Sequence, residues 1–175
     1  MDTTHTITTK KGEFLLSREE SADIGVSICL PETLTDLSED ELAQTFSVSD
    51  RSIVVKTDKE SKVAFVMNAT DVAVQEDMDE EAFVKGLFAA QHTALSRLVP
   101  GYQEYGIKSK KIADHTVICA EYMAHSLEDD LYNIFFLFVH EGKMIYGTFS
   151  YLLEDAPELN IMFLVCLDSL QFTEN

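Results

Sequence analysis

The fold of this chain is decided by residues 131–153, which read LYNIFFLFVHEGKMIYGTFSYLL. Two apolar runs flank a short turn, where Glu141 and Gly142 occupy the positions at which a tight hairpin needs residues that tolerate positive φ. Side chains alternate between the two faces of a strand. The first run is therefore apolar on both faces, with Tyr132, Ile134, Phe136 and Phe138 on one and Leu131, Phe135, Leu137 and Val139 on the other. We expect this hairpin to lie mid-sheet, covered on both sides.

Two segments have the length and the spacing of helices that cover a sheet. Residues 80–99 end at Pro100-Gly101, and their apolar stripe is predicted from Phe83, Leu87, Ala90, Ala94 and Leu98, widened by Val84, Leu95 and Val99. Residues 156–170 form the second helix, with Asp155 as the predicted N-cap and Glu158 at the third helical position. The buried side of this helix is predicted from Leu159, Phe163, Cys166, Leu167 and Leu170.

The other segments read as short strands joined by turns. Residues 24–30, 53–56, 63–70, 105–111 and 117–124 are the predicted strands, and residues 1–12 are a frayed end or an edge strand. Ser38 and Glu41 have the spacing of a capping box for a short helix at 37–46. Without repeats or linkers, residues 1–175 are predicted to form a single α+β domain, in which a mostly antiparallel sheet has helices on both faces.

A net charge of −18 is the strongest global property of the sequence. Such a chain repels nucleic acids and anionic membranes, and it favours a protein partner with a basic surface. The candidate partner-binding residues are Asp77, Asp79, Glu80, Glu128, Asp129 and Asp130. They form one surface only if the acidic runs converge in space. The alternative is that these runs are solvated helix starts and loops, and that the acidity serves solubility.

No motif predicts catalysis, a cofactor or a metal. The sequence lacks a nucleophile elbow, a P-loop and a dinucleotide fingerprint, and none of its five histidines forms HExxH or HxH. Three cysteines in apolar surroundings, without CxxC spacing, predict buried free thiols: Cys29, Cys119 and Cys166. His125 precedes Glu128-Asp129-Asp130, but the ordered loop with glycine that calcium needs is missing, which favours a solvated turn. We therefore expect no enzymatic activity.

The sequence also predicts the compartment. No apolar run reaches the roughly 20 residues of a membrane-spanning helix. The first residues, MDTTHTITTKKGEF, lack the apolar core of a secretion signal. A cytoplasmic location is the resulting expectation.

The order of elements carries a family resemblance. A strand ending in ICLP is followed by the paired strands RSIVVK and SKVAFVMNAT, a long helix, the strand VICAEYMA, the aromatic hairpin and a last helix closing on DSLQF. This order, most clearly over residues 112–172, resembles the Mog1/PsbP-like superfamily, which includes bacterial domains of the DcrB type. The resemblance implies an antiparallel sheet between helices and a binding module without a common catalytic set. A targeting peptide and a lipid-box cysteine are missing, so the specific functions of the photosystem and lipoprotein members are not expected for this chain.

Three functional hypotheses follow. The first is a non-enzymatic cytoplasmic protein-binding domain, an adaptor or chaperone, that uses an acidic surface. The second is an immunity protein that neutralises a basic secreted toxin. The third is a small-ligand-binding domain or enzyme with a pocket between sheet and helix, which requires a deep polar cavity there. A homo-oligomer is compatible with each of them.

Overall fold

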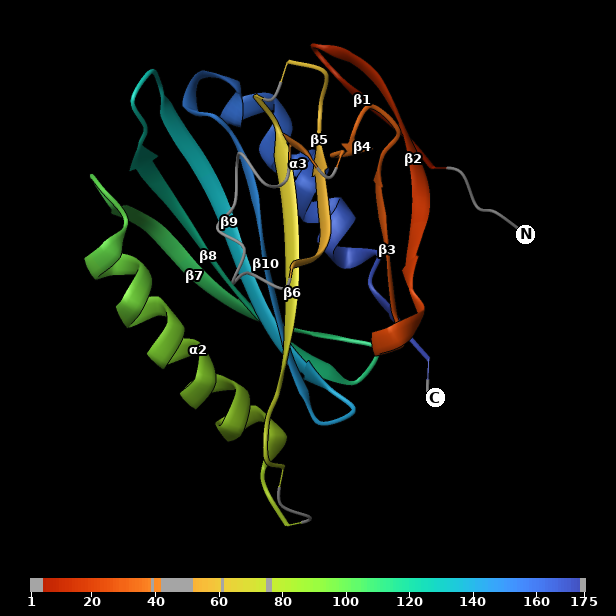
Figure 1. Cartoon of the computed structure of the whole chain (residues 1–175), viewed down its shortest axis with the longest axis vertical. Helices are drawn as coiled ribbons and strands as arrows, with labels where there is room; N and C mark the ends of the chain where they lie inside the picture. Colours follow the sequence, from red (N-terminus) through yellow and green to blue (C-terminus); the bar gives the residue numbers. More distant parts are fainter. Residues whose placement is uncertain (1–4, 39, 42–51, 61, 75–76, 174–175) are drawn as a thin grey trace.

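The computed structural model describes residues 5–38, 40–41, 52–60, 62–74 and 77–173 (Figure 1). Within them the chain forms two sheets in which all strand pairs are antiparallel. The large sheet has the order β4-β5-β6-β10-β9-β8-β7, and the small sheet has the order β1-β2-β3-β11. The strands of the large sheet are β4 (Thr35–Asp36), β5 (Ser52–Thr57), β6 (Ala64–Asp71), β7 (Gln103–Ile112), β8 (His115–His125), β9 (Asp130–His140) and β10 (Lys143–Leu152). Those of the small sheet are β1 (His5–Thr9), β2 (Gly12–Ser21), β3 (Val26–Pro31) and β11 (Gln171–Phe172).

The β9–β10 hairpin lies inside the large sheet, as predicted. His140 pairs with Lys143 across the turn, and Glu141 and Gly142 have φ values of 46° and 72°. The predicted alternation is confirmed, because Phe136 packs into the core on one face while Phe135 packs into the core on the other.

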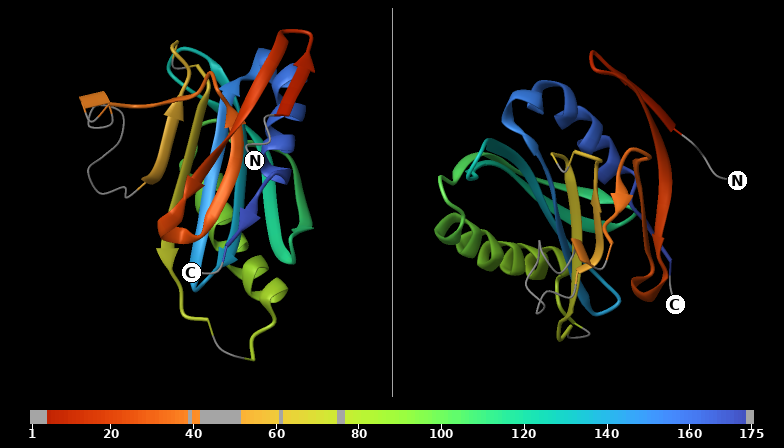
Figure 2. Two further views of the ribbon diagram at one scale, coloured as in Figure 1. Left: turned by 90° about the vertical axis from the view of Figure 1, so that its right-hand side faces the viewer. Right: turned by 45° about the horizontal axis from the view of Figure 1, so that its top comes forward.

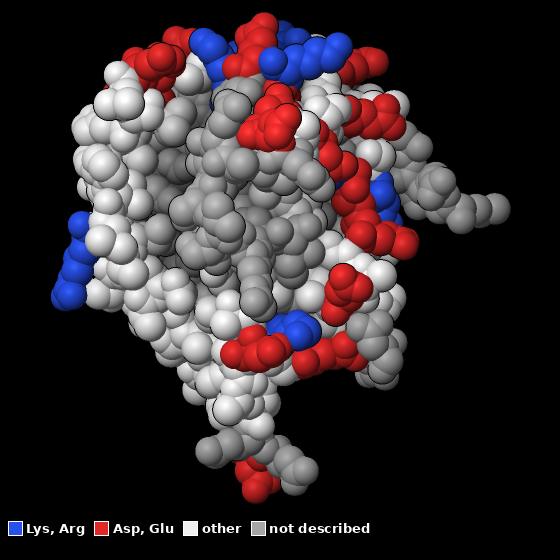
Figure 3. All heavy atoms as spheres, viewed as in Figure 1, with Lys and Arg blue, Asp and Glu red and all other residues white. Residues whose placement is uncertain are grey.

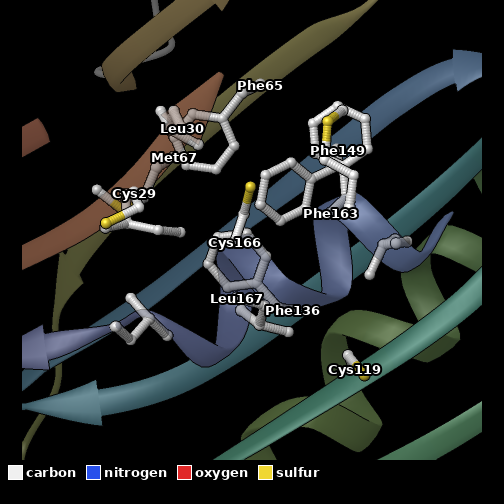
Figure 4. Close-up of a cluster of buried hydrophobic side chains, with 14 of the residues drawn as sticks. Cys29, Leu30, Phe65, Met67, Cys119, Phe136, Phe149, Phe163, Cys166 and Leu167 are labelled. Atoms are coloured by element: carbon white, nitrogen blue, oxygen red, sulfur yellow. The ribbon is translucent and has the colours of Figure 1, made fainter. Parts of the chain in front are cut away.

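The two long helices cover opposite faces of the large sheet (Figures 1 and 2). Helix α3 (Ala156–Asp168) lies between the large and the small sheet, where the ring of Phe163 packs at a tilt against that of Phe149, with centroids 4.8 Å apart. Helix α2 (Glu80–Leu98) lies on the other face, where the ring of Phe88 is 5.9 Å from that of Phe135. Figure 4 shows the core around α3, which contains Cys29 and Cys166. The predicted α+β architecture is therefore confirmed.

The contact stripe of α2 agrees with the predicted one in part, because Phe83, Leu87, Leu95 and Val99 pack against the core. Val84 and Phe88 are its buried residues, whereas Leu98 is 80% exposed and Ala90 and Ala94 are also exposed. Apolar residues occupy 83, 84, 87 and 88 together, so the sequence supports two stripes about 100° apart on the helix. The sheet buries Val84 and Phe88 most deeply and leaves Leu98, at the end of the predicted stripe, exposed.

Asp155 is the N-cap residue of α3, as predicted, but its side chain does not cap the helix. Asp155 has helical backbone angles and its side chain makes no cap hydrogen bond, because the helix continues from a 3-10 turn, η2 (Leu153–Asp155). The Asp155 carboxylate instead pairs with the ammonium of Lys11, which follows β1. The predicted buried side of α3 is confirmed, since Leu159, Phe163, Cys166, Leu167 and Leu170 are each at most 4% exposed.

The first part of the chain agrees with its predictions where it is described. β1 is an edge strand, and β5 pairs with β6. The capping box is present, since the Glu41 carboxylate accepts from the Ser38 backbone N–H at 2.8 Å and Ser38 Oγ accepts from the Glu41 N–H at 3.3 Å. The rest of the helix predicted at 37–46 lies outside the described residues. No described helix is long and apolar enough to cross a membrane.

Candidate functional site

The predicted acidic residues lie at the two ends of β8. Near its start, Asp79 caps α2 by accepting from the Glu81 N–H at 3.0 Å, and Glu80 Oε1 accepts from the Thr116 N–H at 2.9 Å. Asp77 precedes them and is exposed. Asp79 and Glu80 thus fasten α2 to its surroundings, a role that their acidity alone did not predict.

Glu128, Asp129 and Asp130 lie at the other end, where β8 turns into β9 and His125 pairs with Asp130. Eleven residues of extended strand separate the two groups by about 30 Å. The two acidic groups do not converge on a single patch. In Figure 3, acidic side chains occupy several separate areas, one of them along the upper edge over the β8–β9 turn and the start of α3.

The group at the β8–β9 end lines a pocket. Asp129 and Asp130 face Leu152, Leu153 and Glu154 across an open cavity of about 310 Å³. The register of the central hairpin explains this meeting, because Leu131 pairs with Leu152 and so brings η2 beside the start of β9. Glu128 is exposed in the same turn but does not line the cavity.

The turn that carries these carboxylates is held by its own hydrogen bonds. Ser126 Oγ donates to the Asp129 carbonyl at 2.7 Å and accepts from the Asp129 N–H at 3.1 Å. His125 Nδ1 lies 2.5 Å from Asp130 Oδ1. The His125 ring packs against Gly101, where φ is 63° and a Cβ would lie 1.7 Å from the ring. Gly101 is therefore required where it is, and the His125 ring in turn orients Asp130.

The composition of the pocket suits one type of ligand. Three acidic residues and two leucines line it, so that negative charge lies beside apolar surface. Lysine and arginine complement this lining, because each carries a cationic head, which suits the acidic residues, on an aliphatic stem, which suits the leucines. Within the described part of the chain, no group of three or more His, Cys, Asp or Glu residues is placed to hold a metal ion.

Sequence reasoning missed Glu154 as a pocket residue. It lies 24 positions from Asp130 along the chain, next to the aspartate to which the cap was assigned. The only signal for Glu154 was the hairpin register, which follows from the two-residue turn and places the end of β10 beside the start of β9. The register alone does not show that the β10–α3 connection bends back toward Asp130.

A second polar cluster joins α2 to β7. His92 Nε2 lies 2.6 Å from Glu104 Oε2 and 2.9 Å from the Tyr102 hydroxyl, which also donates to Glu104 at 3.3 Å. Burial first, and then the Glu104 charge, raises the pKa of Tyr102 to about 12. All three side chains bond to one another, and the Tyr102 ring stacks on Tyr122 with centroids 4.9 Å apart. This arrangement fastens the helix to the sheet.

The three cysteines are buried free thiols, as predicted. Burial is the largest influence on both thiols whose pKa shifts: it raises the pKa of Cys119 and raises that of Cys166 to about 12. A thiol with a raised pKa forms little thiolate at neutral pH, which is the reactive form. All three cysteines therefore serve as packed side chains of the core.

Comparison with known proteins gives a likeness in structure only. No protein-family model and no curated protein matches the sequence. Among solved structures, cyanobacterial PsbP (CyanoP) from Synechocystis is similar with a TM-score of 0.65, at 12% identity over 95% of this chain and 94% of that chain. The Ran-binding protein Mog1p of Saccharomyces cerevisiae is similar with a TM-score of 0.59, at 9% identity over 91% and 96%.

LpqN of Mycobacterium tuberculosis, described as involved in cell envelope biogenesis, is similar with a TM-score of 0.57, at 12% identity over 91% of this chain and 92% of that chain. At such identities the likeness is one of fold. It confirms the Mog1/PsbP-like resemblance at that level.

Proposed function

We propose that this chain, which has the Mog1/PsbP-like fold, is a non-enzymatic cytoplasmic protein-binding domain of adaptor or chaperone type. Its partner has a basic surface, and a lysine or arginine of the partner enters the pocket lined by Asp129, Asp130 and Glu154. The other predicted residues, Asp77, Asp79, Glu80 and Glu128, contribute through the long-range field of an acidic molecule.

The observation that carries the proposal is the make-up of the pocket. Acidic residues from the β8–β9 turn, the start of β9 and the β10–α3 connection line one open cavity together with Leu152 and Leu153. A cationic head group placed there gains charge-assisted hydrogen bonds, and its aliphatic stem covers the leucines. The exposed Leu127, in the same turn, adds apolar area for a partner to bury.

Two further facts support a protein partner. Mog1p, which shares this fold, is a Ran-binding protein. The net charge of −18 favours rapid association with a basic surface, at a rate that falls as salt rises.

The ligand-binding or enzymatic alternative requires a polar cavity between sheet and helix. In the described part of the α2 interface, Val84 and Phe88 pack against Phe135 and Leu137. The polar groups at the edge of this interface, His92, Tyr102 and Glu104, bond to one another. This packing favours the pocket at the β8–β9 turn as the binding site.

The test compares two triple variants with the same change in charge. Asp129→Asn, Asp130→Asn and Glu154→Gln alter the pocket, whereas the matched control carries Glu13→Gln, Glu20→Gln and Asp114→Asn at exposed positions elsewhere. Partners are captured from native lysate at low and high salt, and their affinities for wild type and both variants are then measured. We expect the pocket variant to lose about tenfold or more in affinity, roughly 1.4 kcal/mol, and the control to lose much less. Equal losses, or no enriched basic partner, would refute the proposal.

A direct probe removes the dependence on finding the partner. Arginine-containing and lysine-containing peptides, and a matched glutamine peptide, are titrated into labelled protein and followed by amide chemical shifts. We expect shifts at Asp129, Asp130 and Glu154 with the two cationic peptides only. Shifts spread evenly over all acidic segments would point to non-specific charge attraction.

A further inference from the structure

A pair of histidines joins the large sheet to the C-terminal strand. His115 begins β8 and His140 ends β9, and His115 Nε2 lies 3.0 Å from His140 Nδ1. His140 is 5% exposed. Neither residue belongs to the pocket or to the α2 interface, and no function above uses them.

The outer nitrogen of each ring faces a backbone carbonyl. His115 Nδ1 lies 3.0 Å from the Ala113 oxygen, and His140 Nε2 lies 3.2 Å from the Thr173 oxygen. A carbonyl oxygen only accepts, so both outer nitrogens must carry hydrogen. Two neutral imidazoles hold one ring proton each, and these two bonds use both.

The inner contact then requires a third proton. If both rings are neutral and both outer nitrogens carry hydrogen, then neither His115 Nε2 nor His140 Nδ1 does. These two nitrogens, 3.0 Å apart, would then present only lone pairs to each other. A hydrogen bond between them exists only when one ring is an imidazolium. The complete set of three bonds is therefore built for a pair that carries a single positive charge.

The surroundings suit that charge. The Phe172 ring stacks on His115 with centroids 3.8 Å apart and planes within 12°, and it lies 5.2 Å from the His140 ring. An aromatic face attracts a cation placed against it. Phe172 belongs to β11, which pairs with β3 of the small sheet, so the pair links the two sheets through the end of the chain.

The charged groups at this end of the sheets come from several elements. They are Asp23 of η1 (Ala22–Ile24), Asp71 of β6 with Lys143 of β10, Glu80 of α2 with Lys111 of β7, and Asp114 and Glu141 in the two turns. The two lysines form ion pairs with Glu80 and Asp71, at 3.4 and 2.6 Å. Acidic groups outnumber the lysines, and β11 brings no ionisable side chain.

We propose that His115 and His140 form a proton-dependent latch, which holds β11 and Thr173 against the large sheet. Closed, the pair holds three ring protons. Released, it holds two at alkaline pH and four at acidic pH. The latch is therefore strongest at the pH at which a released pair would hold, on average, three ring protons. Unconstrained imidazole is half protonated at about pH 6.5, so this optimum is expected near that pH. The latch weakens on both sides of this optimum, by up to about tenfold per pH unit.

The experiment measures hydrogen exchange at the Thr173 amide, which donates to the Gly25 carbonyl at 2.8 Å and reports the closure of β11. Exchange is followed from about pH 5 to about pH 8.5, with EDTA present and with correction for the intrinsic exchange rate. We expect wild-type protection to pass through a maximum. His115→Gln places an amide that donates at every pH opposite His140, and we expect it to remove that maximum. His92→Gln, a histidine variant outside the pair, should keep it.

A second measurement tests the proton count without any variant. Nitrogen chemical shifts of the labelled rings at about pH 6.5 should show hydrogen on His115 Nδ1 and on His140 Nε2, with one further proton shared between the inner nitrogens. A bare outer nitrogen in either ring would overturn the latch. A protection profile with the same shape in wild type and in His115→Gln would do so as well.

Discussion

The Tyr132 hydroxyl donates a hydrogen bond of 3.0 Å to Oε1 of Glu121, and both residues are buried on the α3 face of the large sheet. Lys108 Nζ lies 3.0 Å from the other carboxylate oxygen, Oε2. Burial pushes the pKa of Glu121 up, but hydrogen bonds from Lys108, Asn160 and Tyr132 outweigh it, so this pKa lies below its ordinary value of 4.5. The sheet thus holds a charged carboxylate beside its aromatic core.

Removing the Tyr132 hydroxyl should weaken this site. We expect Tyr132→Phe to lower the free energy of unfolding by about 1.5 to 3 kcal/mol, the worth of a hydrogen bond to a charged group. Tyr105→Phe is the control, since that ring stacks on Tyr132 but is 48% exposed, and it should change stability by less than about 0.5 kcal/mol. Urea unfolding measures both, and equal effects would contradict the assignment.

Glu121 also makes stability depend on pH. A carboxylate whose folded pKa is lowered stabilises the protein above its unfolded pKa, and this contribution is lost as pH falls through the folded value. We expect wild type to lose unfolding free energy below the ordinary value of 4.5. Glu121→Gln should be less stable near neutral pH and should lose less stability on acidification. Parallel acid profiles for the two proteins would contradict this.

Gly147 is required by a close approach inside the sheet. A Cβ there would lie 2.3 Å from the Val66 carbonyl oxygen and 2.6 Å from Phe136 Cζ. We expect Gly147→Ala to destabilise the protein by about 1 to 3 kcal/mol through overpacking. A Cβ added at Gly86, in α2, would meet no neighbouring atom within 4 Å, so Gly86→Ala should stabilise the helix by about 0.5 to 1 kcal/mol. Thermal unfolding of the two variants should therefore shift in opposite directions.

Lys56 connects the small sheet to the edge of the large one. Its side chain is 7% exposed and lies 3.2 Å from Glu19 and 3.1 Å from Asp36, whose side chains are 37% and 78% exposed. Removing both carboxylates leaves a buried charge without a partner, so Glu19→Gln with Asp36→Asn should cost about 3 kcal/mol. Lys56→Met leaves carboxylates that water can reach and should cost less than about 1.5 kcal/mol. The reverse order in urea unfolding would contradict this account.

The observed stripe of α2 can be checked directly. Phe88 is buried against Phe135, and we expect Phe88→Ala to cost about 3 to 5 kcal/mol. Leu98 belongs to the stripe that the sequence predicted but is 80% exposed. Leu98→Ala should therefore change the unfolding free energy by less than about 0.5 kcal/mol. A large loss of unfolding free energy in Leu98→Ala would show that Leu98 is buried and would contradict the observed stripe.

Features that depend on neighbours in the chain were predictable. The alternation of residues 131–139 and the Glu141-Gly142 turn determine the hairpin and its two buried faces, because strand side chains alternate and a two-residue turn sets the register. The helix predicted at 80–99 is observed at 80–98, and its end followed from Pro100-Gly101 for the same local reason. Asp155 holds the predicted N-cap position, but its side chain makes no cap hydrogen bond, because a 3-10 turn precedes the helix and Lys11 pairs with the carboxylate.

By itself, the sequence determined the central hairpin, the two helices that cover it and the acidic character of the molecule, since local spacing and composition carry that information. The tertiary structure decided which residues of α2 are buried and separated Asp79 from Asp129 along β8. It also placed Asp130 and Glu154 around one cavity and brought His115 against His140. These meetings depend on strand register and on how connections bend back over the sheet. Residues distant in sequence become neighbours only through the pairing and packing of whole elements, and no local pattern records that.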